Sequence, residues 1–168
     1  VERILNMVDG VMLLVDAAEG PMPQTKFVLT KALNQNLNPI VLINKVDRSD
    51  QRATEVLNDI FDLFIALDAN DKQLDFPVLY SSAKKGWASN DPDTTGQDME
   101  VLLEKIVGHI PPPDADPNGP LKMLVTSLER DPYLGRVLTG RINSGSIQTN
   151  QKVKSIDRTG KLVEKTRI

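Results

Sequence analysis

The sequence of 168 residues contains no cysteine, a single histidine and only 4% aromatic residues. Without cysteine the chain has neither disulfides nor thiolate metal sites, which is typical of proteins in a reducing compartment. A single histidine excludes a metal centre with several histidine ligands. No apolar run approaches the roughly 18 residues that a membrane-spanning helix needs. With 40% hydrophobic and 26% charged residues, the composition indicates a globular protein, which we expect in the cytoplasm and away from membranes.

Acidic and basic residues are unevenly distributed along the chain. Residues 1–120 carry 10 Lys/Arg against 19 Asp/Glu, a net charge of −9, whereas residues 121–168 carry 10 against 4, a net charge of +6. A basic segment behind an acidic one indicates an anionic partner, such as nucleic acid. The alternative is a solvated strand surface that is basic without binding a ligand, and charge alone leaves both interpretations open.

Three short apolar runs in residues 1–110 predict strands, at 11–15, 40–43 and 76–80. They lack polar alternation, which is typical of strands buried on both faces of a parallel sheet. Apolar residues at helical spacing predict helices between and after these strands. We expect these helices over residues 23–35, from a cap at Asp50 to Leu67, and over residues 98–110. Strands alternating with helices predict an α/β domain with helices on both faces of a parallel sheet.

Residues 111–120, PPPDADPNGP, separate this domain from the remaining chain. Five prolines and one glycine in ten positions stop both helices and central strands, so we expect an interdomain linker. Residues 121–168 consist of short β-like runs between glycine- and asparagine-containing turns, which predicts consecutive antiparallel strands. These 48 residues are few for an independent core. We therefore expect the beginning of a β-barrel, cut short at Ile168.

Polar residues follow two of the predicted strands directly. The sequence Asn44-Lys45-Val46-Asp47 leaves the second strand, and Ser81-Ser82-Ala83-Lys84 leaves the third. In doubly wound sheets, ligands bind beyond the carboxyl ends of the strands. We therefore expect the two segments to be neighbours, although 33 residues separate Asp47 from Ser81.

The chemistry of these side chains points to guanine. The carboxylate of Asp47 accepts hydrogen bonds only, and its two oxygens match the ring N1–H and the exocyclic amine of guanine, a pair of donors that adenine lacks. Asn44 both donates and accepts, so it can bond the base and tie neighbouring loops together. The stem of Lys45 can lie over the base while its ammonium stays in water. Ala83 would offer its backbone N–H to the guanine carbonyl oxygen, and Lys84 could cover the other face of the base.

Several segments resemble a known family. The sequences NKVD and SSAK look like the two base-recognition motifs of the P-loop GTPases. The segment MVDGVMLLVDAAEGPMPQTKFVL resembles the region after the Asp-x-x-Gly motif of translational GTPases. The sequences GPMPQT and DPYLGRVLTGRINSGSI are most similar to those of the TypA/BipA family of ribosome-associated GTPases. This resemblance extends over essentially the whole chain. Elongation factor G and LepA are related alternatives that fit less well at these two places.

The resemblance implies specific roles and partners. It implies guanine contacts from Asn44, Lys45, Asp47, Ser82, Ala83 and Lys84, with GTP or GDP as ligand and Mg²⁺ in the complete protein. Residues 111–120 would link the GTPase domain, residues 1–110, to a second-domain barrel that faces the ribosome. The basic residues 121–168 would then contact ribosomal RNA, with tRNA as a further candidate. The family implies GTP hydrolysis during ribosome assembly or stress-adapted translation, by a monomer.

The sequence departs from this family where phosphate chemistry is concerned. It has no Gly-x-x-x-x-Gly-Lys-Ser/Thr loop. The family's switch-one threonine, its Asp-x-x-Gly magnesium motif and the histidine that follows that motif are also missing ahead of the segment that begins at Met7. The lone His109, expected at the end of the last helix, does not replace that histidine. Because phosphoryl transfer depends on phosphate positioning, we expect a fragment of a GTPase, with no catalytic residue or metal ligand of its own and without hydrolytic activity. A ribosome-binding protein that has lost its phosphate site is the remaining alternative.

Four further residues are expected to have structural roles. Asp16 is predicted to cap the loop after the first strand, although it lies on the ligand side of the sheet. Trp87 is predicted in the loop 86–93 as a surface or packing residue. Phe61 and Phe64 are predicted to be core residues of their helix.

Overall fold

The structure is a computed structural model that describes residues 2–168, without the side chain of Glu2. The chain divides between Pro113 and Asp114 into two compact units. The first unit contains the helices and a four-stranded sheet, and the second contains two β-hairpins. None of the described helices is long and apolar enough to cross a membrane.

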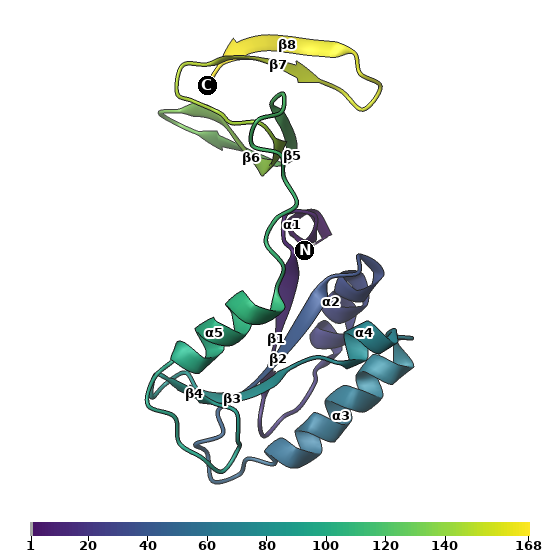
Figure 1. Cartoon of the computed structure of the whole chain (residues 1–168), viewed down its shortest axis with the longest axis vertical. Coiled ribbons are helices and arrows are strands. Elements are labelled where there is room, and N and C mark those ends of the chain that lie inside the picture. The colour runs from purple at the N-terminus through teal and green to yellow at the C-terminus, as the bar shows by residue number, and fades with distance from the viewer. Residues whose placement is uncertain (1) are drawn as a thin grey trace. The chain divides into compact units, whose positions relative to one another are not determined.

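The sheet of the first unit has the strand order β1-β2-β3-β4, which Figure 1 shows. Three strands are parallel, and the short β4 pairs antiparallel with β3. This arrangement confirms the α/β class and the parallel strands. The four strands are β1 (Gly10–Asp16), β2 (Asn38–Asn44), β3 (Val78–Ser82) and β4 (Trp87–Ser89).

Helices cover both faces of this sheet, as the apolar runs predict. The helices α2 (Pro23–Asn34) and α3 (Ala53–Ala66) pack on one face, and α5 (Glu100–His109) packs on the other (Figure 1). The short helices α1 (Glu2–Leu5) and α4 (Asp71–Leu74) complete the unit. Alternate residues of β2 face the two cores. Val41 and Ile43 point toward α3, whereas Ile40 and Leu42 point toward α5.

The predicted start of α3 is wrong. Asp50 is not its cap, because the first helical turn begins after Arg52, whose carbonyl accepts from the N–H of Val56 at 3.0 Å. Asp50 instead forms an ion pair with Arg48, with 2.6 Å between Nη2 and Oδ2. The carboxylate is therefore drawn toward a neighbouring guanidinium instead of the free amides of the helix.

The core position of Phe64 and the packing role of Trp87 are confirmed, whereas the core position of Phe61 and the loop position of Trp87 are wrong. Phe64 is fully buried and packs against Phe76 with 4.4 Å between the centroids of the tilted rings, but Phe61 is 36% exposed at the margin of the same core. Trp87 does not lie in a loop, since it opens β4 and its side chain is buried with α3. Its indole Nε1 has no hydrogen-bond partner among the described residues.

The second unit, residues 114–168, consists of two hairpins. The long strands β5 (Lys122–Asp131) and β6 (Gly135–Ser144) pair antiparallel, as do β7 (Lys152–Ile156) and β8 (Leu162–Arg167). Residues 114–120 of the proline-rich segment belong to this unit. The carbonyl of Asp116 accepts from the N–H of Gly145 at 2.8 Å, which holds the segment against the end of β6.

Candidate functional site

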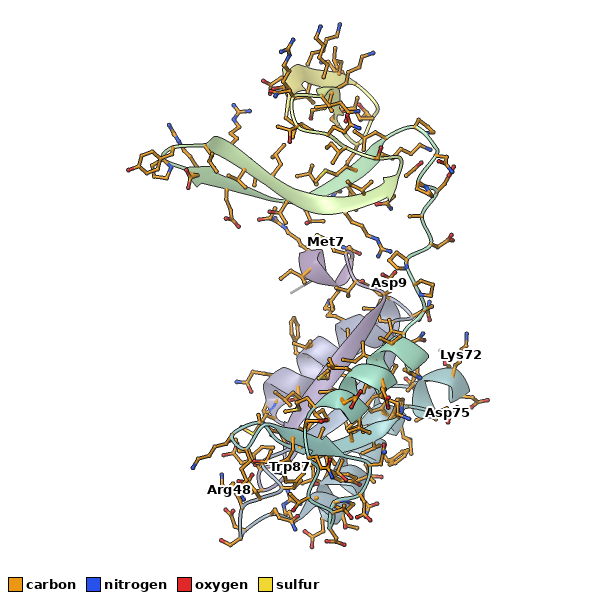
Figure 2. All side chains as sticks on the ribbon, turned by 60° about the vertical axis from the view of Figure 1, so that its left-hand side comes forward. Met7, Asp9, Arg48, Lys72, Asp75 and Trp87 are labelled. Carbon is orange, nitrogen blue, oxygen red and sulfur yellow. The ribbon has the colours of Figure 1, made fainter. Side chains whose placement is uncertain are left out.

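The predicted site residues lie at the carboxyl ends of β2 and β3. Parallel pairing sets Asn44, the last residue of β2, beside Ser81 in β3. The backbone after β2 then turns over β3, since the N–H of Val46 donates to the carbonyl of Ser81 at 3.2 Å. Figure 2 labels Arg48 and Trp87 at this end of the first unit, whereas Asp9, which precedes β1, lies at the other end.

Asn44 joins the two segments directly. Its Oδ1 accepts from the backbone N–H of Ala83 at 3.0 Å and from the hydroxyl of Ser81 at 3.1 Å. Both contacts use the amide oxygen, so the Nδ2 group remains as the donor that this side chain offers to a ligand. A guanine carbonyl oxygen would have to share the N–H of Ala83 with Asn44.

Asp47 lies beside Ser82, and 16% of its side chain is exposed. The Ser82 hydroxyl hydrogen-bonds the carboxylate and, with the charges of Lys85 and Lys84, lowers the pKa of Asp47 below its ordinary value. The ammonium of Lys85 lies 3.8 Å from Oδ2. The carboxylate is therefore ionised at neutral pH, in the state that accepts two N–H donors from one base edge.

Lys45 differs from the prediction at its charged end. Its ammonium does not stay in water alone but forms an ion pair with Asp16 at the end of β1, with 2.6 Å between Nζ and Oδ2. The Lys45 side chain thus spans from the end of β2 to the end of β1, and 53% of it is exposed. The ammonium lowers the pKa of Asp16 to about 2, assisted by the backbone N–H groups of Ala18 and Glu19.

The loop after β1 is held in place from the side of α3. The guanidinium of Arg52 donates to the carbonyl of Ala18 at 2.9 Å, and the backbone N–H of Arg52 donates to the carbonyl of Ala17 at 2.9 Å. Arg52 is itself fixed by Asp59, with 3.0 Å between Nη1 and Oδ2. Arg52, the residue before the first turn of α3, therefore positions the loop that follows Asp16.

Three contributors to this rim were not predicted as site residues, namely Ser81, Lys85 and Asp16 in its role as partner of Lys45. For Asp16 the only signal was its predicted position on the ligand side of the sheet. Lys84 follows Ala83 at the rim as predicted, with an exposed side chain. His109 lies elsewhere, at the end of α5 near Phe76 and Pro77 before β3. The described residues contain no cluster of three or more metal-ligating side chains.

The donor and acceptor set at the rim fits a guanine base. It comprises an ionised carboxylate, an amide whose oxygen is already engaged, and a lysine stem held across the edge of the sheet. Adenine lacks the two adjacent donors that would satisfy the Asp47 carboxylate.

Comparison with known proteins adds independent information. Residues 1–112 match the family model for the elongation factor Tu GTP binding domain. The chain is 50% identical over 161 residues to the large ribosomal subunit assembly factor BipA of Salmonella typhimurium and 49% identical over 170 residues to that of Bacillus subtilis. It covers 26% and 28% of these proteins, so it spans about a quarter of the length of the curated relatives it matches.

A solved structure supports the fold. The translation elongation factor SelB from Methanococcus maripaludis, in its apo form, superposes on 95% of this chain with a TM-score of 0.59 and 21% sequence identity. The match covers 34% of that chain. At this identity the likeness concerns the fold alone.

Proposed function

The chain belongs to the family of elongation factor Tu GTP-binding domains, and from this premise we propose that its first unit binds the base of a guanine nucleotide. The observation that carries the proposal is the position of Asp47, an ionised carboxylate at the ends of β2 and β3. Asn44, Lys45, Ser82, Ala83 and Lys84 form the remainder of the pocket in this proposal. Asp47 selects the base, because only a base with two adjacent donors satisfies both of its oxygens.

For the full-length gene product we propose GTP hydrolysis with Mg²⁺ on the ribosome, in the cytoplasm and as a monomer. The support is the high identity to proteins named large ribosomal subunit assembly factors. Ribosome assembly or stress-adapted translation is the process in which we place it. The residues described above supply base recognition, and no step of phosphate chemistry is assigned to them.

Nucleotide selectivity tests the base pocket. Calorimetry on the full-length product should give tight binding of GDP, weaker binding of IDP and the weakest binding of ADP. IDP keeps the ring N1–H but lacks the exocyclic amine, so it satisfies one oxygen of Asp47 and leaves the other without its donor. ADP has neither donor at these positions, so its affinity should be lower than that of GDP by a factor on the order of 10⁴. Equal affinities for GDP and ADP would remove guanine recognition from the proposal.

The second unit is proposed to contact ribosomal RNA through the β5–β6 hairpin. Its turn is held by Asp131, whose Oδ1 accepts from the N–H groups of Tyr133 at 2.7 Å and Leu134 at 2.8 Å. Tyr133 is 96% exposed, and Arg130 and Arg136 face each other at the base of the turn. An exposed ring in a turn that two arginines flank in the sequence suits a base and its neighbouring phosphates.

Changes in this hairpin should weaken binding to ribosomal subunits. In the full-length product, Tyr133→Ala should lower the affinity by roughly tenfold, since stacking contributes about 1–3 kcal/mol per base. Arg130→Gln should reduce the slope of log affinity against log salt by about one. Sedimentation binding assays between 50 and 200 mM salt measure both effects. Lys72→Gln, which removes an exposed cation from the first unit, is the control, and equal loss in this variant would refute a role for the hairpin.

A further inference from the structure

Lys45 adopts a backbone conformation that requires support. Its φ of 67° lies in the left-handed region, which costs a residue with a Cβ atom about 1–2 kcal/mol. Such conformations persist where surrounding contacts determine them, and they concentrate at ligand-binding positions. The backbone of Lys45 is therefore held by neighbours, and the closest charged neighbour of its side chain is Asp16.

Asp16 is built to hold that side chain. Its Oδ1 accepts from the N–H of Ala18 at 2.8 Å and of Glu19 at 3.2 Å, which fixes the plane of the carboxylate. The other oxygen, Oδ2, is buried and has no partner among the described residues besides the Lys45 ammonium at 2.6 Å. Only 13% of the Asp16 side chain is exposed. The carboxylate thus offers a single fixed oxygen to a single cation.

The strand ends and the loop keep this carboxylate at a constant position. Asp16 is paired with Asn44 in the register of β1 and β2, and the N–H of Ala17 donates to the carbonyl of Asn44 at 2.8 Å. Arg52 fixes the loop from the other side through the carbonyls of Ala17 and Ala18. The ion pair therefore connects the last residue of β1 with the residue that follows β2, at the carboxyl ends of two adjacent parallel strands.

We propose that Asp16 is a positioning residue for nucleotide binding, which holds the Lys45 stem across the sheet edge where the base docks. The inference rests on the proposed guanine site. Without the ion pair, the four methylene groups of Lys45 are free to leave this edge, and ordering them again opposes binding. Asp16 makes no contact with the base itself and acts through Lys45.

The test is a double-mutant cycle on GDP affinity in the full-length gene product. Asp16→Asn keeps the shape of the side chain and removes its charge, and Lys45→Met keeps most of the stem and removes the ammonium. Each change should weaken GDP binding by about fivefold to twentyfold, in line with a partly exposed ion pair that also supports a strained backbone. The double variant should be no weaker than the worse single variant by more than about twofold.

A matched control separates positioning from general electrostatics. Asp50→Asn removes an exposed carboxylate that forms an ion pair of the same length, 2.6 Å, with Arg48. It should leave GDP affinity unchanged. In the nucleotide-free protein, Asp16→Asn should also leave the melting temperature within a few degrees of the wild-type value. If the role of Asp16 were purely structural, the variant would have a lower melting temperature and an unchanged GDP affinity.

The outcomes distinguish this inference from the proposed function. Wild-type affinity in Asp16→Asn, or effects of the two changes that multiply in the double variant, would overturn the positioning role and leave the guanine site intact. Equal affinities of the wild-type protein for GDP and ADP would instead overturn the proposed guanine site. If Asp16→Asn does not fold, Asp16→Glu replaces it in the same cycle, because its longer side chain displaces the ammonium while keeping the charge.

Discussion

Replacing Asp47 with asparagine should weaken GTP binding by roughly 10²- to 10⁴-fold and shift the preference of the protein toward xanthosine triphosphate. The carboxylate accepts two charge-assisted hydrogen bonds from guanine in the proposed pocket, and each such bond contributes about 1.5–3 kcal/mol. The amide of asparagine keeps one acceptor and presents an N–H₂ donor toward the exocyclic amine, which is itself a donor. Xanthine carries an oxygen at that position, which accepts from the new amide.

Calorimetry with GTP and XTP on the full-length product and its Asp47→Asn variant measures this change in nucleotide preference. The lowered pKa of Asp47, caused first by the Ser82 hydroxyl, means that the wild-type carboxylate is charged over the usual assay range. The variant therefore removes a charge as well as changing an acceptor to a donor. Ser82→Ala is the companion variant. It should weaken GTP binding far less and leave the base preference as it is, since Ser82 supports the carboxylate without replacing it. An unchanged ratio of GTP to XTP affinity in Asp47→Asn would exclude Asp47 from base recognition.

Replacing Phe64 with alanine should lower the free energy of unfolding of the first unit by about 3–5 kcal/mol. The ring is fully buried between α3 and the segment before β3, and it contacts Phe76 at 4.4 Å between centroids. Its removal leaves a cavity that the surrounding helix and sheet fill only partly. Because Phe76 leads into β3, the strand that carries Ser81 and Ser82, loss of this contact should also loosen the base pocket.

Phe61→Ala is the matched comparison, since it removes the same ring one turn earlier in α3. Phe61 is 36% exposed although it also packs against Phe76, with 4.7 Å between the ring centroids. The Phe61→Ala substitution should lower the free energy of unfolding by about 1 kcal/mol, a typical value for a single substitution. Urea denaturation gives the two values, and hydrogen exchange of the α3 amides assigns them to this unit. Equal losses would contradict the division of the two rings into core and margin.

The strands and helices with long, uniform patterns of apolar residues could be predicted from the sequence. The runs 11–15 and 40–43 are apolar at every position, so they identify β1 and β2 without knowledge of their neighbours. The three residues of β4 carry no such pattern, because Trp-Ala-Ser is too short to show a period. The capping prediction for Asp50 failed for another reason, since a carboxylate two residues from Arg48 has a competing partner that helix rules do not consider.

Prediction of the candidate site depended on topology more than on contacts. Because the carboxyl ends of parallel strands meet at one edge of the sheet, Asn44 and Ala83 could be expected to lie close together. The structure places the N–H nitrogen of Ala83 3.0 Å from Oδ1 of Asn44. The ion pairs of Lys45 with Asp16 and of Asp47 with Lys85 were not foreseen. Lysine side chains reach several directions from one backbone position, and their partners are set by tertiary structure that spacing along the chain does not encode.

The placement of Trp87 gives the protein an optical property. It is the only tryptophan in the chain, and it pairs in register with Ser82 across β3 and β4. Its indole is buried without a hydrogen bond to the described residues, so its emission responds to the polarity and rigidity of one place in the fold. The fluorophore thus lies in β4, directly beside the strand that contains Ser82. Within these 168 residues tryptophan emission comes only from the vicinity of the candidate site.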